Sequence, residues 1–304
     1  MRLSSLSHRN PIHNSVGVRL STARLRATAV VASAMGLLFA PAALADTTTS
    51  SNWAGYAVHR TGVSYRAVEG SWRQPSVSCT PGARTYSSYW VGLGGYSVNS
   101  RALEQIGTEV DCTGSGKVRS TAWYELVPDP SVQLELTVVP GDVLKASVSI
   151  SGRRVSLSLY DVTRGHGFVR TVTASLIDVT SAEWIVEAPS ECISANACET
   201  LPLANFGSAQ FTSALATSSA RHAGGILDPA WQTTKINLVP SARRFFVSTG
   251  SFAPSIGVAM PSALGADGRS FAVSYSRVSS TTTSQSVAKR SSALRAGYLV
   301  HPGR

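Results

Sequence analysis

Charged residues are scarce in this sequence, and segments with the periodicity of a long amphipathic helix are nearly absent. Asp, Glu, Lys and Arg make up 14% of the 304 residues, whereas Ser, Thr, Val, Gly and Ala are abundant. This composition disfavours a cytosolic α/β enzyme and favours an exported all-β protein. The length allows one large β domain or two ordinary domains.

The chain also lacks a basic surface of the kind that binds nucleic acid, although its formal net charge is +10. The excess belongs to the two ends, since residues 1–45 and 278–304 hold nine of the 27 basic residues and no acid. Residues 46–277 are left with 18 basic and 17 acidic residues. Because no basic stretch there is interleaved with aromatic residues, we expect no nucleic-acid partner.

No segment beyond residue 45 is apolar over a length that could cross a bilayer, so we expect no stable membrane anchor. The N-terminus has the pattern of an export signal: a basic, Ser-rich opening, an apolar run over 27–42, and a small-x-small sequence at Ala43-Leu44-Ala45. We predict a signal peptide over residues 1–45, one β-sandwich domain over 46–277, and a flexible, basic, Ser/Thr-rich tail over 278–304. The protein is accordingly expected to be secreted and extracellular.

All four cysteines follow the predicted cleavage site, which suits an oxidising compartment. Cys192 and Cys198 are close enough to close one loop, and Cys79 and Cys112 would then form the second disulfide. Three pairings are possible from the sequence, so this one is a hypothesis. A zinc site is the alternative, but neither a Cys-x-x-Cys pair nor a His cluster supports it. We expect no metal and no cofactor.

Apolar and polar residues alternate with period two along much of the chain, which is the pattern of strands with one buried face. The clearest runs cover 132–138, 147–150 and 155–159, separated by turn sequences at Pro140-Gly141-Asp142 and Gly152. The last strands are expected at 204–211, 235–239 and 271–275, with a less regular segment over 240–262. We predict an all-β fold, an antiparallel β-sandwich of two large sheets of concanavalin-like or jelly-roll-like type.

Two glutamates lie on one face of an otherwise apolar segment, 182–187. Read as a strand, this segment points Trp184 and Val186 to one side and Glu183, Ile185 and Glu187 to the other. A carboxylate on a half-buried sheet face tends to have a raised pKa, which suits proton transfer. An exposed, solvated sheet face is the alternative interpretation.

Earlier strands carry polar residues among tryptophans. Gln105 shares a strand face with Leu103 and Gly107, and Glu125 shares one with Trp123, while Trp90 lies in a third apolar stretch. If these faces meet those of Glu183 and Glu187, they form a polar groove floored by tryptophans, as in ligand sites. Tryptophans that merely pack a sandwich core are the other interpretation.

In order along the chain, these segments resemble the eqolisin family of glutamic peptidases, secreted acid endopeptidases best known from fungi. The matching segments are Ser50–Gly55, Pro75–Val77, Trp90–Gly92, Leu103–Gly107, Ala122–Glu125 followed by Pro128-Asp129, Gly141-Asp142, Ala182–Glu187 and Phe206–Ser208. The resemblance covers about 50–212, with a looser likeness to near 277. It implies a sandwich fold, a catalytic pair of Gln105 and Glu187, and a substrate-binding site lined by Trp90, Trp123 and Glu125.

The implied chemistry is hydrolysis of protein or peptide substrates at acidic pH by a monomer. Glu187 would take a proton from the attacking water, and Gln105 would orient that water and donate to the oxyanion. The chain departs from the fungal pattern, since Gly94 and Thr121 replace acids while Glu109 is kept in kind. Fewer carboxylates near Glu187 argue against assuming the strongly acidic optimum, and the chain is expected to be a bacterial-type member.

Two other functions fit the same residues. A non-catalytic carbohydrate-binding sandwich would use the tryptophans as stacking platforms and Glu183 and Glu187 as hydroxyl ligands. A glycosidase would use paired carboxylates. The motif around Gln105 argues against the first, and the lack of an obviously opposed carboxylate pair argues against the second.

Overall fold

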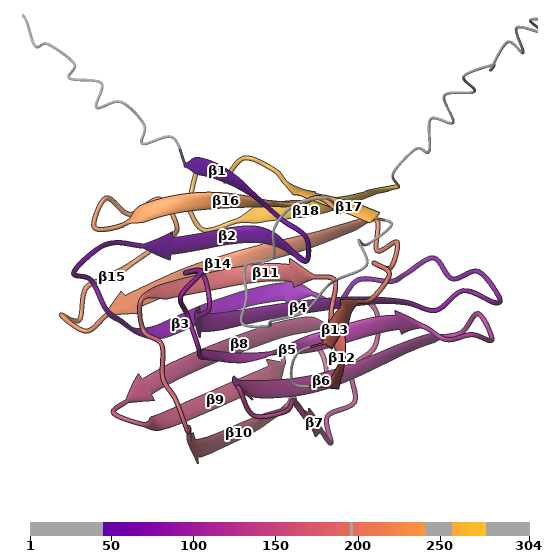
Figure 1. The fold of residues 1–304 in the computed structure, drawn as a ribbon, viewed down its shortest axis with the longest axis horizontal. Coiled ribbons are helices and arrows are strands. Elements are labelled where there is room, and N and C mark those ends of the chain that lie inside the picture. The colour runs from indigo at the N-terminus through magenta and orange to yellow at the C-terminus, as the bar shows by residue number, and fades with distance from the viewer. Residues whose placement is uncertain (1–44, 195–196, 241–256, 278–304) are drawn as a thin grey trace, which may run out of the picture. The chain divides into compact units, whose positions relative to one another are not determined.

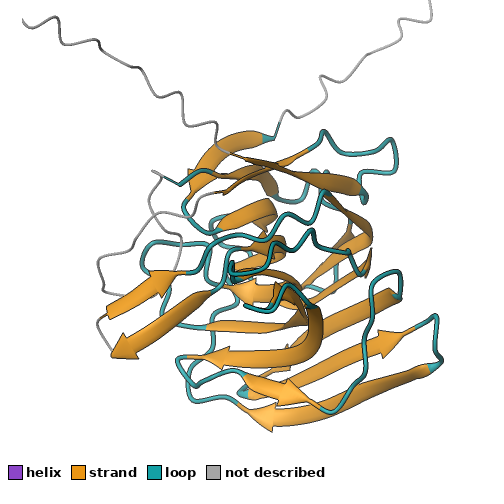
Figure 2. Ribbon diagram, turned by 90° about the vertical axis from the view of Figure 1, so that its right-hand side faces the viewer, coloured by secondary structure: helices purple, strands orange, loops and turns teal. Residues whose placement is uncertain are grey.

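The computed structural model describes residues 45–194, 197–240 and 257–277, and for residues 192–199 it describes the backbone alone. The regular structure within these ranges consists of strands, and the described residues contain no helix (Figure 2). The predicted all-β class is therefore confirmed. The predicted signal peptide and tail lie outside the described residues, apart from Ala45.

The strands in chain order are β1 (Asp46–Ser50), β2 (Trp53–His59), β3 (Tyr65–Arg73), β4 (Thr85–Gly94), β5 (Leu103–Cys112), β6 (Val118–Val127), β7 (Val132–Leu134), β8 (Val143–Ser151), β9 (Arg154–Asp161), β10 (His166–Thr173), β11 (Ser181–Glu187), β12 (Ser190–Ser194), β13 (Ala197–Thr200), β14 (Ser208–Ser218), β15 (Ala223–Gly224), β16 (Gln232–Leu238), β17 (Gly257–Pro261) and β18 (Phe271–Arg277).

Most of these strands belong to one continuous sheet that folds back on itself into two layers (Figures 1 and 2). One layer has the order β10-β9-β8-β3-β14-β18, and the other has the order β16-β2-β11-β4-β5-β6-β7. Strand β17 pairs with both β18 and β16 and so joins the layers. The predicted antiparallel sandwich is confirmed with two additions, this join and the parallel pairing of β1 with β16.

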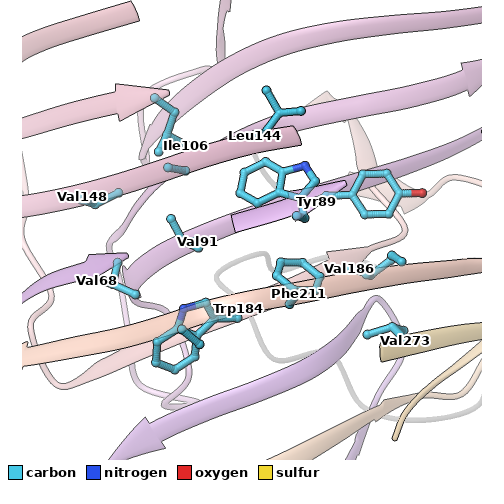
Figure 3. Packing of buried hydrophobic residues seen from close by; sticks show 14 of the residues in the cluster. Val68, Tyr89, Val91, Ile106, Leu144, Val148, Trp184, Val186, Phe211 and Val273 are labelled. Atoms are coloured by element: carbon cyan, nitrogen blue, oxygen red, sulfur yellow. The ribbon is translucent and has the colours of Figure 1, made fainter. Parts of the chain in front are cut away.

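The main hydrophobic core lies between the two layers and is rich in aromatic residues (Figure 3). Trp72 and Phe211 lie with ring centroids 5.9 Å apart, and Phe211 stacks on Phe271 at 5.0 Å. The indole of Trp184 is buried too, and its N–H donates to the backbone carbonyl of Glu69 in the opposite layer at 2.7 Å. Removing any of these rings costs about 3–5 kcal/mol in comparable cores.

A second apolar cluster covers the opposite face of β2, β11, β4, β5 and β6. Strand β11 shows the alternation directly, because Trp184 and Val186 belong to the main core whereas Ile185 belongs to the second cluster. The face assignment made for 182–187 is therefore correct. This second face carries the polar residues of the candidate site.

Cys79 and Cys112 form the predicted disulfide, with an S–S distance of 2.02 Å. It links the segment before β4 to the end of β5, which are neighbouring strands. Cys192 and Cys198 are register partners on β12 and β13, but their side chains lie outside the described part of the structure, so the second disulfide stays a prediction.

Several strands of the structure are longer, shorter or shifted compared with the strands predicted from the sequence. The run 132–138 is a strand only over β7, because β7 pairs with β6 alone and that pairing ends at Leu134. The strand expected at 204–211 begins at Ser208 and continues to Ser218. The segment 240–262 was expected to be irregular, yet its last part is β17, and residues 241–256 lie outside the described ranges.

Candidate active site

Register across four strands brings the polar residues onto one face. Glu183 of β11 pairs with Gly92 of β4, Gly92 pairs with Gln105 of β5, and Gln105 pairs with Glu125 of β6. Directly paired residues point to the same side of a sheet, so this row lies on the face of the second apolar cluster. We call this face of β2, β11, β4, β5 and β6 the catalytic face.

Glu187 ends β11 on the catalytic face and is half-buried. The side-chain amide of Asn52 donates to its Oε1 at 3.0 Å, and the indole N–H of Trp90 donates to its Oε2 at 2.8 Å. Both carboxylate oxygens are therefore held by neutral donors. Asn52 is itself oriented, because its Oδ1 accepts a hydrogen bond from Ser50 Oγ at 3.0 Å.

Asn52 is a site residue that the sequence analysis missed. It belongs to the matched segment 50–55, but the residue type and spacing of an Asn after two Ser residues do not by themselves indicate a functional role. Its position next to Trp53, the register partner of Glu187, is what places it beside the carboxylate.

Gln105 and Glu125 form a hydrogen-bonded pair across β5 and β6. Gln105 Nε2 donates to Glu125 Oε2 at 2.7 Å, and Gln105 is only 3% exposed. Gln105 Oε1 accepts no hydrogen bond from the described residues. The amide therefore keeps one N–H and its carbonyl oxygen available for other partners.

The environment of Glu125 favours its neutral form. Its pKa is raised to about 7, first by burial and then by the negative charge of Glu187, while the hydrogen bond from Gln105 acts in the opposite direction. The effect of Glu187 on this pKa also shows that the two carboxyl groups lie within electrostatic reach. Gln105 and Glu125 are thus hydrogen-bonded, and Glu187 lies within electrostatic reach of Glu125.

Three buried tryptophans, Trp53, Trp90 and Trp123, pack around the polar residues of the site. Trp90 packs edge-to-face against Trp53 with ring centroids 5.0 Å apart, and Trp90 is paired with Gly107, which is paired with Trp123. A Cβ added at Gly107 would lie 2.6 Å from Trp90 Cβ and 2.3 Å from the carbonyl oxygen of Tyr89, so glycine is required here. Trp123 is 9% exposed, and its indole N–H has no partner among the described residues.

Glu183 does not belong to the open part of the site. It is fully buried, so the interpretation of its strand face as exposed and solvated is wrong. Its pKa lies well above the ordinary value because of burial, and the nearby carboxyls of Asp178 and Glu104 raise it further. Glu104 is also fully buried, and its pKa is raised to about 9, mainly by burial.

The structure explains one departure from the fungal pattern. Gly94 has a φ of +82°, and a Cβ there would lie 2.5 Å from the Cβ of Asp178. Asp178 therefore fills the space that an acidic side chain at position 94 would need. Its Oδ2 accepts hydrogen bonds from the backbone N–H of Gly95 at 3.3 Å and from the hydroxyl of Ser100.

Ser88 of β4 pairs with Glu187 of β11 on one side and with Glu109 of β5 on the other. Glu109 is therefore separated from Glu187 by one intervening strand, β4. Burial raises its pKa, and it interacts with Asp111 two residues later, whose pKa is raised to about 8 by burial and by the charge of Glu109. Within the described ranges, no group of three or more His, Cys, Asp or Glu side chains is arranged to hold a metal ion.

Comparison with known proteins shows the family and the fold to which the chain belongs. The Peptidase A4 family model matches residues 51–245. Scytalido-glutamic peptidase with a peptide-based transition-state analogue is similar in structure, with a TM-score of 0.57, 25% sequence identity, and coverage of 74% of this chain and 98% of that chain. SCP-B, described as a member of the eqolisin family in complex with the tripeptide Ala-Ile-His, has a TM-score of 0.55, 24% identity and the same coverage.

A search of curated protein sequences found no match. The fold and the family match define a β-sandwich hydrolase that acts on peptide bonds, a glutamic endopeptidase. The chain belongs to the Peptidase A4, or eqolisin, family. No helix in the described residues is long and apolar enough to span a membrane.

Proposed function

We propose that the protein is a secreted endopeptidase that cleaves protein substrates at acidic pH, with Gln105 and Glu187 as its catalytic pair. The observation that carries this proposal is the anchoring of both side chains on one face. Asn52 and Trp90 hold Glu187, and Glu125 holds Gln105. Each catalytic group is thereby fixed by a separate partner.

Amide hydrolysis needs an activated water, a donor to the oxyanion and a proton for the departing amine. An ionised Glu187 takes a proton from water as the water attacks the carbonyl carbon, then returns that proton to the amine nitrogen as the C–N bond breaks. Gln105 Oε1 accepts from the same water, and the N–H not used by Glu125 donates to the oxyanion. One carboxylate suffices because the amide does its work without titrating.

The pKa of Glu125 supports an acidic working range. Below about 7 this carboxyl is neutral, so it adds no negative charge beside Glu187. As the pH rises through about 7, a second negative charge develops beside Glu187. That charge repels the oxyanion of the transition state, so we expect activity to fall there.

Secretion is supported by two features. The Cys79–Cys112 disulfide suits an oxidising compartment. The first described strand, β1, begins at Asp46, directly after the predicted cleavage site. We propose that the mature protein acts outside the cell as a monomer.

The decisive experiment is digestion of casein by the purified protein across pH 2–7 with pepstatin present. We expect cleavage that Glu187→Gln reduces by roughly 10²–10⁴-fold and that Gln105→Ala reduces by roughly 10²–10³-fold. Glu135→Gln is the matched control, since Glu135 is exposed just after β7. Full activity in either site variant, with circular dichroism showing a native fold, would remove that residue from the mechanism.

The burial of the tryptophans argues against the carbohydrate-binding alternative. Trp53 and Trp90 are fully buried and Trp123 is 9% exposed, whereas sugar stacking needs an open ring face. Absence of cleavage at every pH together with retained polysaccharide binding would reverse this preference.

A further inference from the structure

A pocket of about 500 Å³ lies on the outer face of the other layer, over β3, β8 and β14. We call it the β14 pocket, and its floor includes Ser71, Thr212 and Ser213. Trp72 of β3 points into the main core, so by alternation Ser71 points outward, away from the core. The pocket contains no residue of the catalytic pair and serves no step of the reaction.

A β-bulge shapes this pocket. The register between β14 and β3 shifts between Thr212 and Leu215, and Ser213 has a φ of 56°. Phe211 and Ala214 both face the main core, so the two residues between them are left exposed on the outer side. Bulges and left-handed residues other than glycine concentrate at functional sites, where they direct side chains.

The bulge also fixes a charged loop beside the pocket. The backbone N–H of Ala214 donates to the carbonyl oxygen of Arg269 at 3.0 Å, which attaches the loop before β18 to β14. Arg269 and Asp267 of this loop line one end of the pocket. Asp267 accepts hydrogen bonds from the backbone N–H of Arg269 at 3.0 Å and from Ser270 Oγ at 2.8 Å.

The side of the pocket away from this loop carries Lys145, and the central strand carries Glu69. Lys145 on β8 pairs with Ser71 on β3, and Glu69 is two residues before Ser71 on the same face. In the described part of the chain, no ion pair within 4.0 Å involves Lys145, Glu69 or Arg269. The pocket lining therefore offers two cations and two acids, and its floor offers hydroxyl groups.

We propose that the β14 pocket binds short peptides of two or three residues through their free termini. The α-carboxylate pairs with a cation at one end, and the α-ammonium pairs with an acid at the other. Strands β8 and β14 flank β3, so they lie about 10 Å apart at the usual strand spacing. At about 3.3 Å per residue, an extended tripeptide spans about this distance and a dipeptide spans about 7 Å.

The balance of charge selects this ligand class over others. A polyanion would meet Glu69 and Asp267, and a polycation would meet Lys145 and Arg269. The hydroxyls of the floor donate to and accept from a peptide backbone, and Leu215 adds a small apolar contact. A neutral glycan could use the hydroxyls, but it carries no charge that could pair with these side chains.

The test is an NMR titration of the ¹⁵N-labelled wild-type protein with trialanine at pH 5. We expect saturable shifts at residues 69–71, 145, 212–215 and 267–269, separate from any shifts at the catalytic face. Lys145→Ala and Arg269→Ala should each weaken binding at least tenfold, and blocking both peptide termini should do the same. Lys117→Ala, which removes an exposed lysine from the β5–β6 turn, should leave binding unchanged.

Three results would overturn the proposal: no saturable shift in these residues, shifts confined to the catalytic face, or equal binding of the blocked peptide. Equal shifts with a neutral oligosaccharide would assign the pocket to glycans instead. Lys145 and Arg269 are exposed, so their variants should fold, and unchanged casein cleavage by both would show that the pocket is separate from the catalytic pair.

Discussion

The side-chain amide of Gln105 donates a 2.7 Å hydrogen bond to the carboxylate of Glu125 on the neighbouring strand. An ionised carboxylate only accepts hydrogen bonds, so it fixes the NH₂ end of the amide toward itself. A protonated Glu125 still accepts this hydrogen bond through its carbonyl oxygen, so protonation leaves the pairing intact. The orientation of Gln105 by Glu125 therefore does not require that Glu125 be charged.

Replacing Glu125 with Gln should extend activity above pH 7. The wild-type carboxyl, with a pKa raised to about 7, becomes charged there, whereas the amide of the variant stays neutral. The profile of kcat/KM against pH measures this effect, with Glu135→Gln as the control for a distant carboxyl. An unchanged decline above pH 7 would show that another group causes it.

Replacing Trp90 with Phe should lower kcat/KM by roughly 10–100-fold. The substitution removes the N–H that donates to Glu187 Oε2, and hydrogen bonds to charged groups contribute about 1.5–3 kcal/mol. Trp231→Phe is a matched control, since its indole N–H donates to the carbonyl of Gly225, which lies outside the site. Equal losses in both variants would indicate general destabilisation.

Replacing Gly107 with Ala should destabilise the fold by about 1–3 kcal/mol or more. The added methyl group would press on Trp90 and on the backbone of Tyr89. Gly114→Ala is the control, because a Cβ there would lie 3.4 Å from its nearest neighbour, an ordinary contact. Urea unfolding measures both, and equal stability of the two variants would contradict the crowding described at Gly107.

The free energy of unfolding should decrease as the pH rises from about 4.5 towards 9. Glu104 and Glu183 have raised pKa values in the folded state, so their contribution is complete below the ordinary Glu pKa and is lost as the pH approaches the folded value, about 9 for Glu104. The expected loss is on the order of a few kcal/mol.

Urea midpoints at pH 5, 7 and 9 measure this dependence. Glu104→Gln should flatten the curve, because an amide of the same shape does not ionise. A wild-type stability that rises between pH 5 and 9 would contradict the assignment of these buried carboxyls as neutral.

Local alternation was enough to predict the strands and the faces of 182–187. It placed Trp184 in the core and Glu187 on the opposite face, as observed. It could not predict that Glu183 is fully buried, because burial depends on which other segments pack over that strand face. The bulge at Ser213 was also missed, since an extra residue in one strand is defined only against its partner strand.

The sequence also predicted only part of the candidate site, because contacts between distant strands cannot be read from one segment. Gln105, Glu125 and Glu187 belong to motifs whose residue types suggest chemistry. Asn52 lacks such a signal, and its role follows only from the pairing of Trp53 with Glu187. Pairings between distant strands determine the site, and they are not encoded in the spacing of any one segment.

The pairing of early strands with late ones has a consequence for synthesis. Val68 of β3 pairs with Ala216 of β14, and Gly55 of β2 pairs with Ile236 of β16. Neither early strand can complete its hydrogen bonds until most of the chain has left the ribosome, and such non-local topologies fold slowly. A nascent chain that stays unfolded for this long is well suited to threading through a translocation pore before its sheet closes.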